Sequence, residues 1–242
     1  MRALYFAKRT AKEILRDPMT VGFGLGFPLV LLFLLSAIQA NIPVELFEIS
    51  SLAPGIAVFG LTFMALFSAQ LISKDRESAF LQRLFTTPMT AADFILGYIL
   101  PMLPIALMQS IICYGAALAL GLDFSPWVIA AVVMSLPSGV LFIALGVLFG
   151  SVLTVKQVGG ICGALLTNVT AWLSGIWFDL DLVGGVFSRI ANCLPFVHGV
   201  EGCRAVLAGN MAGAIEHIAV VMCYAVVILC IGIWCFTRKM KN

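Results

Sequence analysis

The apolar runs of this chain limit its fold more than any other feature of the sequence. No charged residue occurs in residues 49–73 or in residues 94–122. A helix needs about 20 apolar residues to cross the hydrocarbon core of a bilayer, so each of these runs is long enough. Hydrophobic residues make up 62% of the chain and charged residues 11%, which excludes an ordinary soluble protein. The sequence therefore predicts an all-α, polytopic membrane protein.

Runs of this kind predict six transmembrane helices. We expect them at residues 19–40, 53–73, 94–120, 127–153, 158–178 and 218–237. The first run is not interpreted as a signal peptide, because it exceeds the usual apolar core of about 7 to 15 residues and no Ala-x-Ala site closes it. Two parts are thus expected: an amphipathic interfacial helix at residues 1–18 and a six-span transmembrane domain at residues 19–240.

Basic residues are distributed unevenly between the segments that connect these spans. If the amino terminus lies in the cytoplasm, the inner segments contain every Lys and Arg except Arg189 and Arg204. Lys and Arg concentrate in cytoplasmic loops of membrane proteins. The distribution therefore predicts a multi-pass protein of the cell membrane with both termini in the cytoplasm.

One charged segment, residues 74–93, separates the second and third predicted spans. Four of its apolar residues recur at helical spacings: Phe80, Leu81, Leu84 and Phe85. This pattern predicts a short amphipathic helix whose apolar edge contacts a partner or the membrane surface. Pro88 should end this helix.

The end of the same segment carries the signals of a new helix. Thr90 and Asp93 have the spacing of a capping box, and Met89 and Phe94 are placed as a hydrophobic staple. The third span should therefore start here in a fixed direction. A short helix held in this way could move the span when a partner displaces it.

Residues 2–17 also predict an amphipathic helix. A helical projection places Leu4, Ala7, Ala11, Ile14 and Leu15 on one arc, and Arg2, Arg9, Lys12 and Arg16 on the opposite side. Such a helix should lie along the inner membrane surface. It is either a topology anchor that binds anionic lipid or an element of coupling.

Two apolar pieces before the last span, residues 182–188 and 190–200, are too short to cross a bilayer. Irregular backbone at membrane depth persists only where it is buried in protein. We therefore favour a re-entrant helical pair that enters from the outer side, with Pro195 at its turn. A loop lying on the outer surface is the alternative.

Small and polar residues within the spans suggest helix contacts. Three glycine pairs have GxxxG spacing, although the 22 glycines of the chain make chance matches common: Gly22 and Gly26, Gly146 and Gly150, and Gly159 and Gly163. For Gln70, Gln109 and Asn168, interhelical hydrogen bonds are favoured over contact with cargo. Cys193 and Cys203 both fall on the outer side, and whether they form a disulfide is left open.

Two separate motifs carry a resemblance to a known family. Near the carboxyl end, PFVHGVEGCR at residues 195–204 contains a proline, an apolar residue, a polar or basic residue and, six positions later, an arginine. Ser174, Gly175 and Phe178 precede it at the end of the fifth predicted span. In and after the charged segment, an acidic residue, a leucine pair, a Thr-Pro turn and a glycine follow in order: Glu77, Leu81, Leu84, Thr87, Pro88 and Gly97.

With six spans in this order, the chain resembles the type-2 ABC transporter permeases, the membrane subunits of ATP-driven exporters. The resemblance covers nearly the whole chain. Three departures concern the subfamily and the cargo rather than the class: Ser78 where the family often has glycine, Tyr98 where lysine is frequent, and residues 183–186 where a proline-bearing turn is usual.

The resemblance implies export of an amphipathic or apolar substrate, such as a drug, an antibiotic, a lipid or a peptide-like molecule. It also implies a homo- or heterodimer with a second permease subunit, and a separate ABC ATPase that binds ATP and Mg²⁺. We expect the ATPase to couple through these residues: Glu77, Phe80, Leu81, Arg83, Leu84, Phe85, Thr87 and Pro88. We expect an outer gate at Pro195, His198, Glu201 and Arg204.

Several kinds of chemistry have no residues to support them in this sequence. No lysine follows a glycine, so the chain lacks a P-loop for ATP. No H-E-x-x-H or C-x-x-C motif occurs, so we expect neither a metal site nor an enzyme, and no cofactor or nucleic acid is expected to bind. No charged residue or histidine lies at mid-depth in a span, which disfavours an ion-coupled secondary carrier. That carrier, and a non-transporting scaffold or immunity protein, remain the alternatives.

Overall fold

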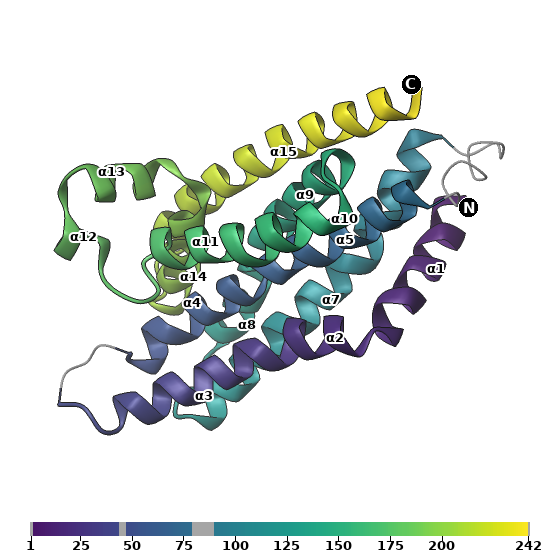
Figure 1. Cartoon of the computed structure of the whole chain (residues 1–242). Helices are drawn as coiled ribbons and strands as arrows, with labels where there is room; N and C mark the ends of the chain where they lie inside the picture. The colour runs from purple at the N-terminus through teal and green to yellow at the C-terminus, as the bar shows by residue number, and fades with distance from the viewer. Residues whose placement is uncertain (1, 44–46, 79–89, 242) are drawn as a thin grey trace.

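The computed structural model describes residues 2–43, 47–78 and 90–241. Within these residues the chain forms helices joined by turns, and it contains no β-strand. Figure 1 shows the helices lying roughly side by side in one elongated bundle. The predicted all-α class is confirmed.

The helices are described in chain order. Helix α1 (Arg2–Arg16) is followed by α2 (Pro18–Val21), η1 (Gly22–Gly26) and α3 (Phe27–Gln39), and then by α4 (Ile49–Gly60) and α5 (Thr62–Glu77). Next come α7 (Ala91–Ala119), α8 (Pro126–Met134), α9 (Leu136–Val152), α10 (Val155–Val158), η2 (Gly159–Leu166) and α11 (Thr167–Leu173). The chain ends with α12 (Leu180–Val183), α13 (Gly185–Cys193), α14 (Pro195–Leu207) and α15 (Met211–Lys241).

Among the described residues, five helical segments are long and apolar enough to cross a membrane: Pro18–Gln39, Ile49–Glu77, Ala92–Ala119, Pro126–Val152 and Met211–Arg238. They coincide with five of the predicted spans. The segment that forms α10, η2 and α11 covers the other predicted span only as far as Leu173. Gly175 adopts a positive φ of 67°, which turns the chain out of the helix before Phe178. The predicted end of this span was therefore too late.

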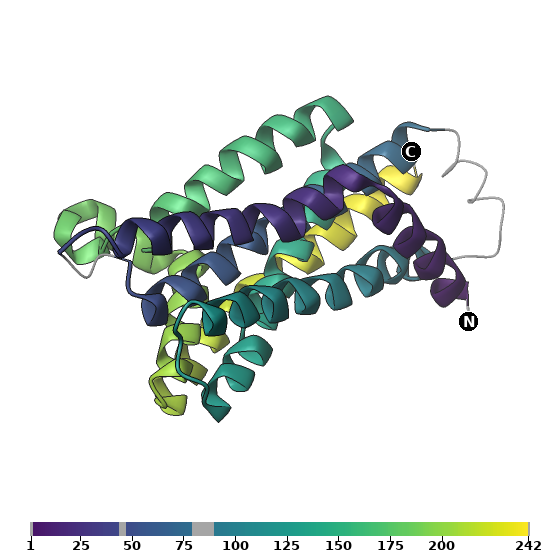
Figure 2. The same ribbon diagram turned by 90° about the horizontal axis from the view of Figure 1, so that it is seen from below.

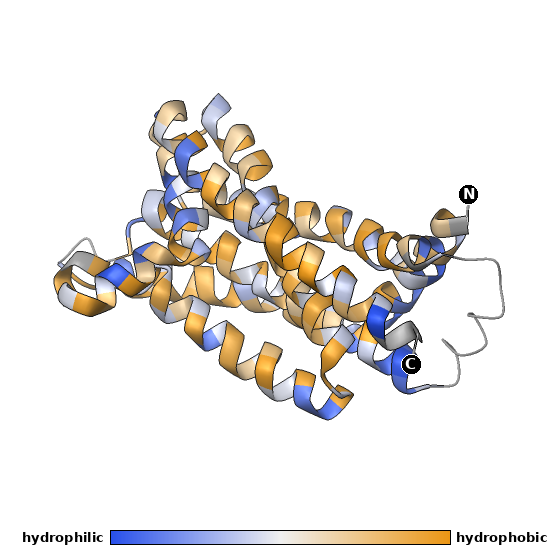
Figure 3. Cartoon of the chain, turned by 90° about the horizontal axis from the view of Figure 1, so that it is seen from above, coloured by the Kyte–Doolittle hydropathy of each residue, from blue (hydrophilic) through white to orange (hydrophobic). Residues whose placement is uncertain are grey.

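The bundle has two distinct ends. Figures 1 and 2 show α1, the end of α5 and the last turns of α15 at one end, while α12 and α13 lie at the other. Figure 3 shows apolar residues along most of the helix lengths and the most hydrophilic residues gathered mainly toward the ends. This is the arrangement that a bilayer requires of helices that cross it.

The helix pair α4 and α5 forms the centre of the bundle and breaks at Leu61. There the Leu61 amide donates to Val58 O in a tighter turn. The amide of Gln109 on α7 donates to Ala57 O over 3.3 Å, and the Gln109 side chain is fully buried. The interhelical use predicted for Gln109 is confirmed.

One of the three glycine pairs forms a close helix contact. A Cβ atom on Gly146 of α9 would lie 2.7 Å from Ala65 O of α5, and one on Gly150 would lie 2.9 Å from Ala69 Cα. Gly22 and Gly159, from the other two pairs, have nothing within 4 Å of such an atom. The backbones of α5 and α9 thus approach each other because glycine occupies two successive turns.

Gly146→Ala is expected to lower the free energy of unfolding by about 1 to 3 kcal/mol, because the added methyl group meets backbone atoms that cannot move aside. Gly159→Ala is the matched control and should cost nothing, since the space around it is open. Unfolding by SDS in mixed micelles, monitored by tryptophan fluorescence, measures the free energy of unfolding of both variants. Equal stability of the two variants would show that the contact is not as tight as described.

Helix α1 packs against α7, and its buried face differs in part from the predicted arc. The ring of Phe6 packs edge-on against Phe94 and Tyr98, with centroid distances of 5.5 and 5.0 Å. Ala7 and Ile14 of the predicted arc are buried, but Leu4 and Leu15 are 70% and 64% exposed. The predicted arc is thus divided between contacts inside the protein and the exposed side of α1, and Phe6, which the arc did not include, fits against the aromatic rings of α7. That α1 lies along the membrane surface stays a prediction.

The apolar pieces predicted at residues 182–188 and 190–200 correspond to α13 and α14 with shifted bounds. Leu194 has extended backbone and Pro195 is the first residue of α14, so the predicted turn is in place. Helix α14 is buried through Phe196, Val200 and other residues of one face. By contrast α12 and α13 project from the bundle in Figure 1, and Val186 of α13 is 71% exposed.

Candidate functional site

The predicted coupling residues are only partly described by the structure. Glu77 is the last residue of α5. The remaining residues lie outside the described part of the chain: Phe80, Leu81, Arg83, Leu84, Phe85, Thr87 and Pro88. The site is therefore built here from the two helices that lead into and out of residues 79–89.

Helix α5 continues through the charged residues that the sequence assigned to a separate segment. It includes Lys74, Asp75, Arg76 and Glu77, and the Asp75 side chain is only 4% exposed. Asp75 was expected in water, but its carboxylate is enclosed by partners from other helices. The expected boundary at Lys74 was therefore too early, because these charges pair inside the protein and allow the helix to continue.

Asp75 joins three helices at the end of the bundle that carries α1. The guanidinium of Arg9 on α1 donates to both carboxylate oxygens, over 2.5 and 3.0 Å. The hydroxyl of Tyr98 on α7 donates to Asp75 Oδ2 over 2.9 Å. A two-pronged contact of this kind has fixed geometry and is stronger than a neutral hydrogen bond. Hydrogen bonds to Asp75 thus connect α5, which precedes residues 79–89, with α7, which follows them, and with α1.

The charge state of Arg9 follows from this contact. Partial burial lowers the pKa of Arg9, but the hydrogen bond that it donates to Asp75 and the negative charges of Asp75 and Glu13 outweigh burial, so its pKa is raised. Arg9 therefore remains a cation at every working pH. The projection placed Arg9 on the polar side of α1, and from there its side chain reaches Asp75 of α5.

The next two residues of α5 hold the connection between α9 and α10. Arg76 donates to the backbone oxygens of Ser151 and Leu153. Glu77 Oε1 accepts from the Val155 amide over 2.9 Å, at the start of α10. Glu77, predicted to contact an ATPase, is thus engaged within the chain. This contact attaches the connection between α9 and α10 to the end of α5.

The helix that leaves residues 79–89 begins as the sequence predicts. The Thr90 hydroxyl accepts from the Asp93 amide over 3.3 Å, and Asp93 Oδ2 accepts from the Thr90 amide over 2.9 Å. The capping box is therefore confirmed. Phe94 is fully buried, while Met89, its predicted partner in the staple, lies outside the described residues.

The predicted outer-gate residues all lie on α14, and two of them form links to other elements. Arg204 pairs with Glu201 over 2.7 Å, as a pair three residues apart on a helix can. Its other nitrogens donate to Ser51 O and Gly175 O over 3.2 and 3.1 Å. Arg204 thus connects α14 with the start of α4 and the turn after α11. A cavity of about 620 Å³ lies beside this cluster.

His198 links α14 to α15 and α13. Its Nδ1 lies 2.8 Å from Nδ1 of His217, and its Nε2 lies 2.9 Å from Asn192 O. Pro195 begins the helix that carries these residues. Nearby, Cys193 is exposed and Cys203 is fully buried, and both are free thiols. The structure therefore brings the four outer residues together on one helix but forms no disulfide there.

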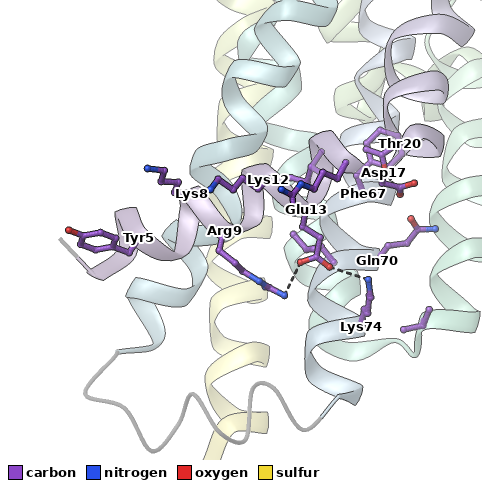
Figure 4. Close-up of a pocket in the computed structure, with 14 residues that line it drawn as sticks. Tyr5, Lys8, Arg9, Lys12, Glu13, Asp17, Thr20, Phe67, Gln70 and Lys74 are labelled. Atoms are coloured by element: carbon purple, nitrogen blue, oxygen red, sulfur yellow. Dashed lines mark hydrogen bonds and ion pairs between the residues drawn. The ribbon is translucent and has the colours of Figure 1, made fainter.

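A row of aromatic rings, which the sequence patterns above did not predict, runs along α4 and α5. Phe59, Phe63 and Phe67 succeed one another with centroid distances of 6.3 and 6.2 Å, and Phe59 lies 6.1 Å from Trp177. Phe23 and Phe27 pack against this row from η1 and α3. The spacing of four residues between the three phenylalanines would have revealed it. One end of the row, Phe67, lines the cleft shown in Figure 4. The other end, Trp177, is the neighbour in sequence of Ile176, which lines the cavity beside Arg204.

No group of three or more His, Cys, Asp or Glu side chains that could hold a metal ion occurs within residues 2–43, 47–78 and 90–241. The features that do occur are apolar helices of membrane-crossing length, helix ends joined by charge pairs, and a row of aromatic rings. They define a multi-pass membrane protein.

The comparisons with known proteins agree with this class. The model of the ABC-2 type transporter family matches residues 3–208. The chain therefore belongs to the ABC-2 type transporter family, and it is a permease-type membrane component of transport. A protein of Pyropia yezoensis described as a transport permease, ycf38, is 33% identical over 119 residues. That match covers 47% of this chain and 41% of the relative's length.

Proposed function

We propose that the chain is the transmembrane permease subunit of an ABC exporter, driven by ATP that a separate subunit hydrolyses. Two such permease subunits would enclose a cargo path, and each would bind one ATPase through the segment between α5 and α7. The observation that carries this proposal is the contact of Asp75 with Arg9 and Tyr98. Because it joins the helices on both sides of residues 79–89, a partner that displaces this segment would move α1, α5 and α7 together.

The proposed subunit has six spans. The segment Val155–Leu173, formed by α10, η2 and α11, is the sixth helical stretch beside the five candidates. It packs against α5 over much of its length. Helix α14 would enter the membrane from the outer side as the buried half of a re-entrant pair, and α13 would lie nearer the surface. The links of Arg204 to Ser51 and Gly175 then make α14 a part of the outer gate.

The proposed cargo is apolar or amphipathic. The aromatic row lies between η1, α3, α4 and α5, and Phe23 and Phe27 remain 49% and 37% exposed. Aromatic rings bind apolar groups through large contact areas without requiring a particular hydrogen-bond pattern. The row consists of Phe and Trp rings, so the part of the cargo that contacts it would be apolar.

Transport assays in reconstituted vesicles test the proposed function. Vesicles that contain this chain and its ATPase should accumulate a lipophilic dye only when ATP is present, and ionophores that collapse ion gradients should not abolish uptake. Uptake that requires an ion gradient and proceeds without ATP would instead identify an ion-coupled carrier. Absence of transport under both conditions would favour a scaffold or immunity protein.

The proposed orientation places both termini and Gln82 in the cytoplasm and Glu48 outside. In a background from which the seven cysteines have been removed, a cysteine at position 48 should react with a membrane-impermeant maleimide on intact cells. A cysteine at position 82 should react only after the cells are opened. The charge asymmetry gives this orientation. Labelling of position 82 but not position 48 on intact cells would mean that it is inverted.

A further inference from the structure

A cleft of about 800 Å³ opens between α1 and α5 at the end of the bundle that carries α1. Helix α1 and the start of α2 form one wall, and α5 forms the other. Figure 4 shows Lys8, Arg9, Lys12 and Glu13 along α1, and Lys74 opposite them on α5. The cleft shares Arg9 with the Asp75 contact but does not include Asp75 itself.

The cleft is apolar at its floor. Ile14, Phe67 and Leu71 line it and are each less than a tenth exposed. Phe67 is also the inner end of the aromatic row. A ligand with an apolar portion would therefore find apolar contacts inside the cleft.

The carboxylates that line the cleft are already engaged. Glu13 pairs with Arg9 over 2.8 Å and with Lys74 over 3.1 Å, as the dashed lines in Figure 4 mark. Asp17 accepts from the Met19 amide over 3.1 Å and from the Thr20 hydroxyl over 2.7 Å, which caps α2. These two carboxylates are outnumbered by the five Lys and Arg side chains that line the cleft.

Three cations that line the cleft, Lys8, Lys12 and Arg16, form no ion pair with any described residue. They follow one another at intervals of four residues, so they lie along one side of α1. All three are exposed. The cleft therefore combines an excess of positive charge at its mouth with an apolar floor.

We propose that this cleft binds the phosphate headgroup of an anionic phospholipid, with the phosphate on Lys12 and Arg16 and the start of the acyl chains on Phe67. A cluster of basic residues on an amphipathic helix next to a membrane span attracts anionic headgroups. A free phosphate would use the same cations, but it would leave the apolar floor without a partner. The inference goes beyond the proposed function and depends on it only for the leaflet, which is the inner one.

The test measures lipid that stays bound to the purified full chain. The protein is placed in nanodiscs of phosphatidylcholine with a minor share of phosphatidylglycerol, and native mass spectrometry determines how much phosphatidylglycerol is retained. The double variant K12Q/R16Q should retain roughly tenfold less than the parent, because two attractive charges are lost. The matched control K156Q/R238Q removes the same charge from two exposed residues that do not line the cleft, and it should retain as much as the parent.

Two further arms distinguish the possible sources of the phosphate. The exchange variant K12R/R16K keeps both charges and should retain phosphatidylglycerol at the parental level, which also shows that changes at these positions are tolerated. Excess inorganic phosphate should not displace the lipid. Equal retention by K12Q/R16Q and the parent would overturn the site, and displacement by inorganic phosphate would overturn its assignment to a lipid.

Discussion

Leu84→Asp is expected to abolish export and to weaken binding of the ATPase by about 100-fold or more. The amphipathic pattern places Leu84 on the apolar edge of the predicted helix, which we propose enters a pocket on the partner. An aspartate there would bring an unpaired charge into an apolar contact, which costs several kcal/mol. Co-purification of the ATPase and ATP-dependent uptake into vesicles measure the two effects separately.

Gln82→Asp is the matched control for Leu84→Asp. It adds the same charge to the same segment but on the polar side of the predicted helix. Binding of the ATPase and transport should stay within a few-fold of the parent, and both variants should reach the membrane in equal amounts. If Leu84→Asp binds its ATPase and transports at the parental rate, the segment between α5 and α7 is not the coupling element.

Asp75→Ala is expected to lower the free energy of unfolding by about 3 kcal/mol, near the lower end of the range for breaking a buried ion pair. The substitution leaves Arg9 half-buried without its main partner and removes the acceptor of the Tyr98 hydroxyl. The loss is at the lower end because the Arg9 side chain is 35% exposed and water reaches it. SDS unfolding measures the loss, and ATP-driven transport should fall with it because the hydrogen-bonded link of α5 to α1 and α7 through Asp75 is lost.

Two comparisons separate the Asp75 contact from ordinary surface charge. Glu13→Ala removes a second carboxylate from the same Arg9, but this pair is more exposed and should contribute less than about 1 kcal/mol. The double variant R9L/D75L replaces the pair by apolar side chains and should recover much of the stability. It should not recover coupling, since directional hydrogen bonds would be absent. Full transport by the double variant would show that packing alone joins these helices.

The sequence predicted the spans well because apolar runs and helix caps are local features. The capping box of Thr90 and Asp93 and the turn at Pro195 were placed correctly, since their signals lie within a few residues of each other. The end of the helix at Leu173 was missed because it depends on the positive φ of Gly175. That conformation is one that glycine permits but does not require.

The site was less predictable because its contacts join residues far apart in the chain. Asp75 stands between two basic residues and looks like part of a solvated charged segment. Its partners Arg9 and Tyr98 are 66 and 23 residues away in sequence. In the sequence, Tyr98 stands out only as a departure from the resembled family. Its hydrogen bond to Asp75 shows what the side chain does in the structure. The contact of Gly146 with Ala65 was similarly hidden, since many glycine pairs share its spacing but few face a neighbouring backbone.

The central claim is that this chain is the membrane subunit of a transporter whose ATPase is another polypeptide. The most direct measurement isolates the tagged chain from its native membranes, identifies its partners by mass spectrometry and measures ATP hydrolysis by the complex. We predict that an ATPase with a P-loop co-purifies in stoichiometric amounts and that Leu84→Asp removes it. If the intact chain transports cargo while no ATPase is enriched above a mock isolation, the claim is contradicted.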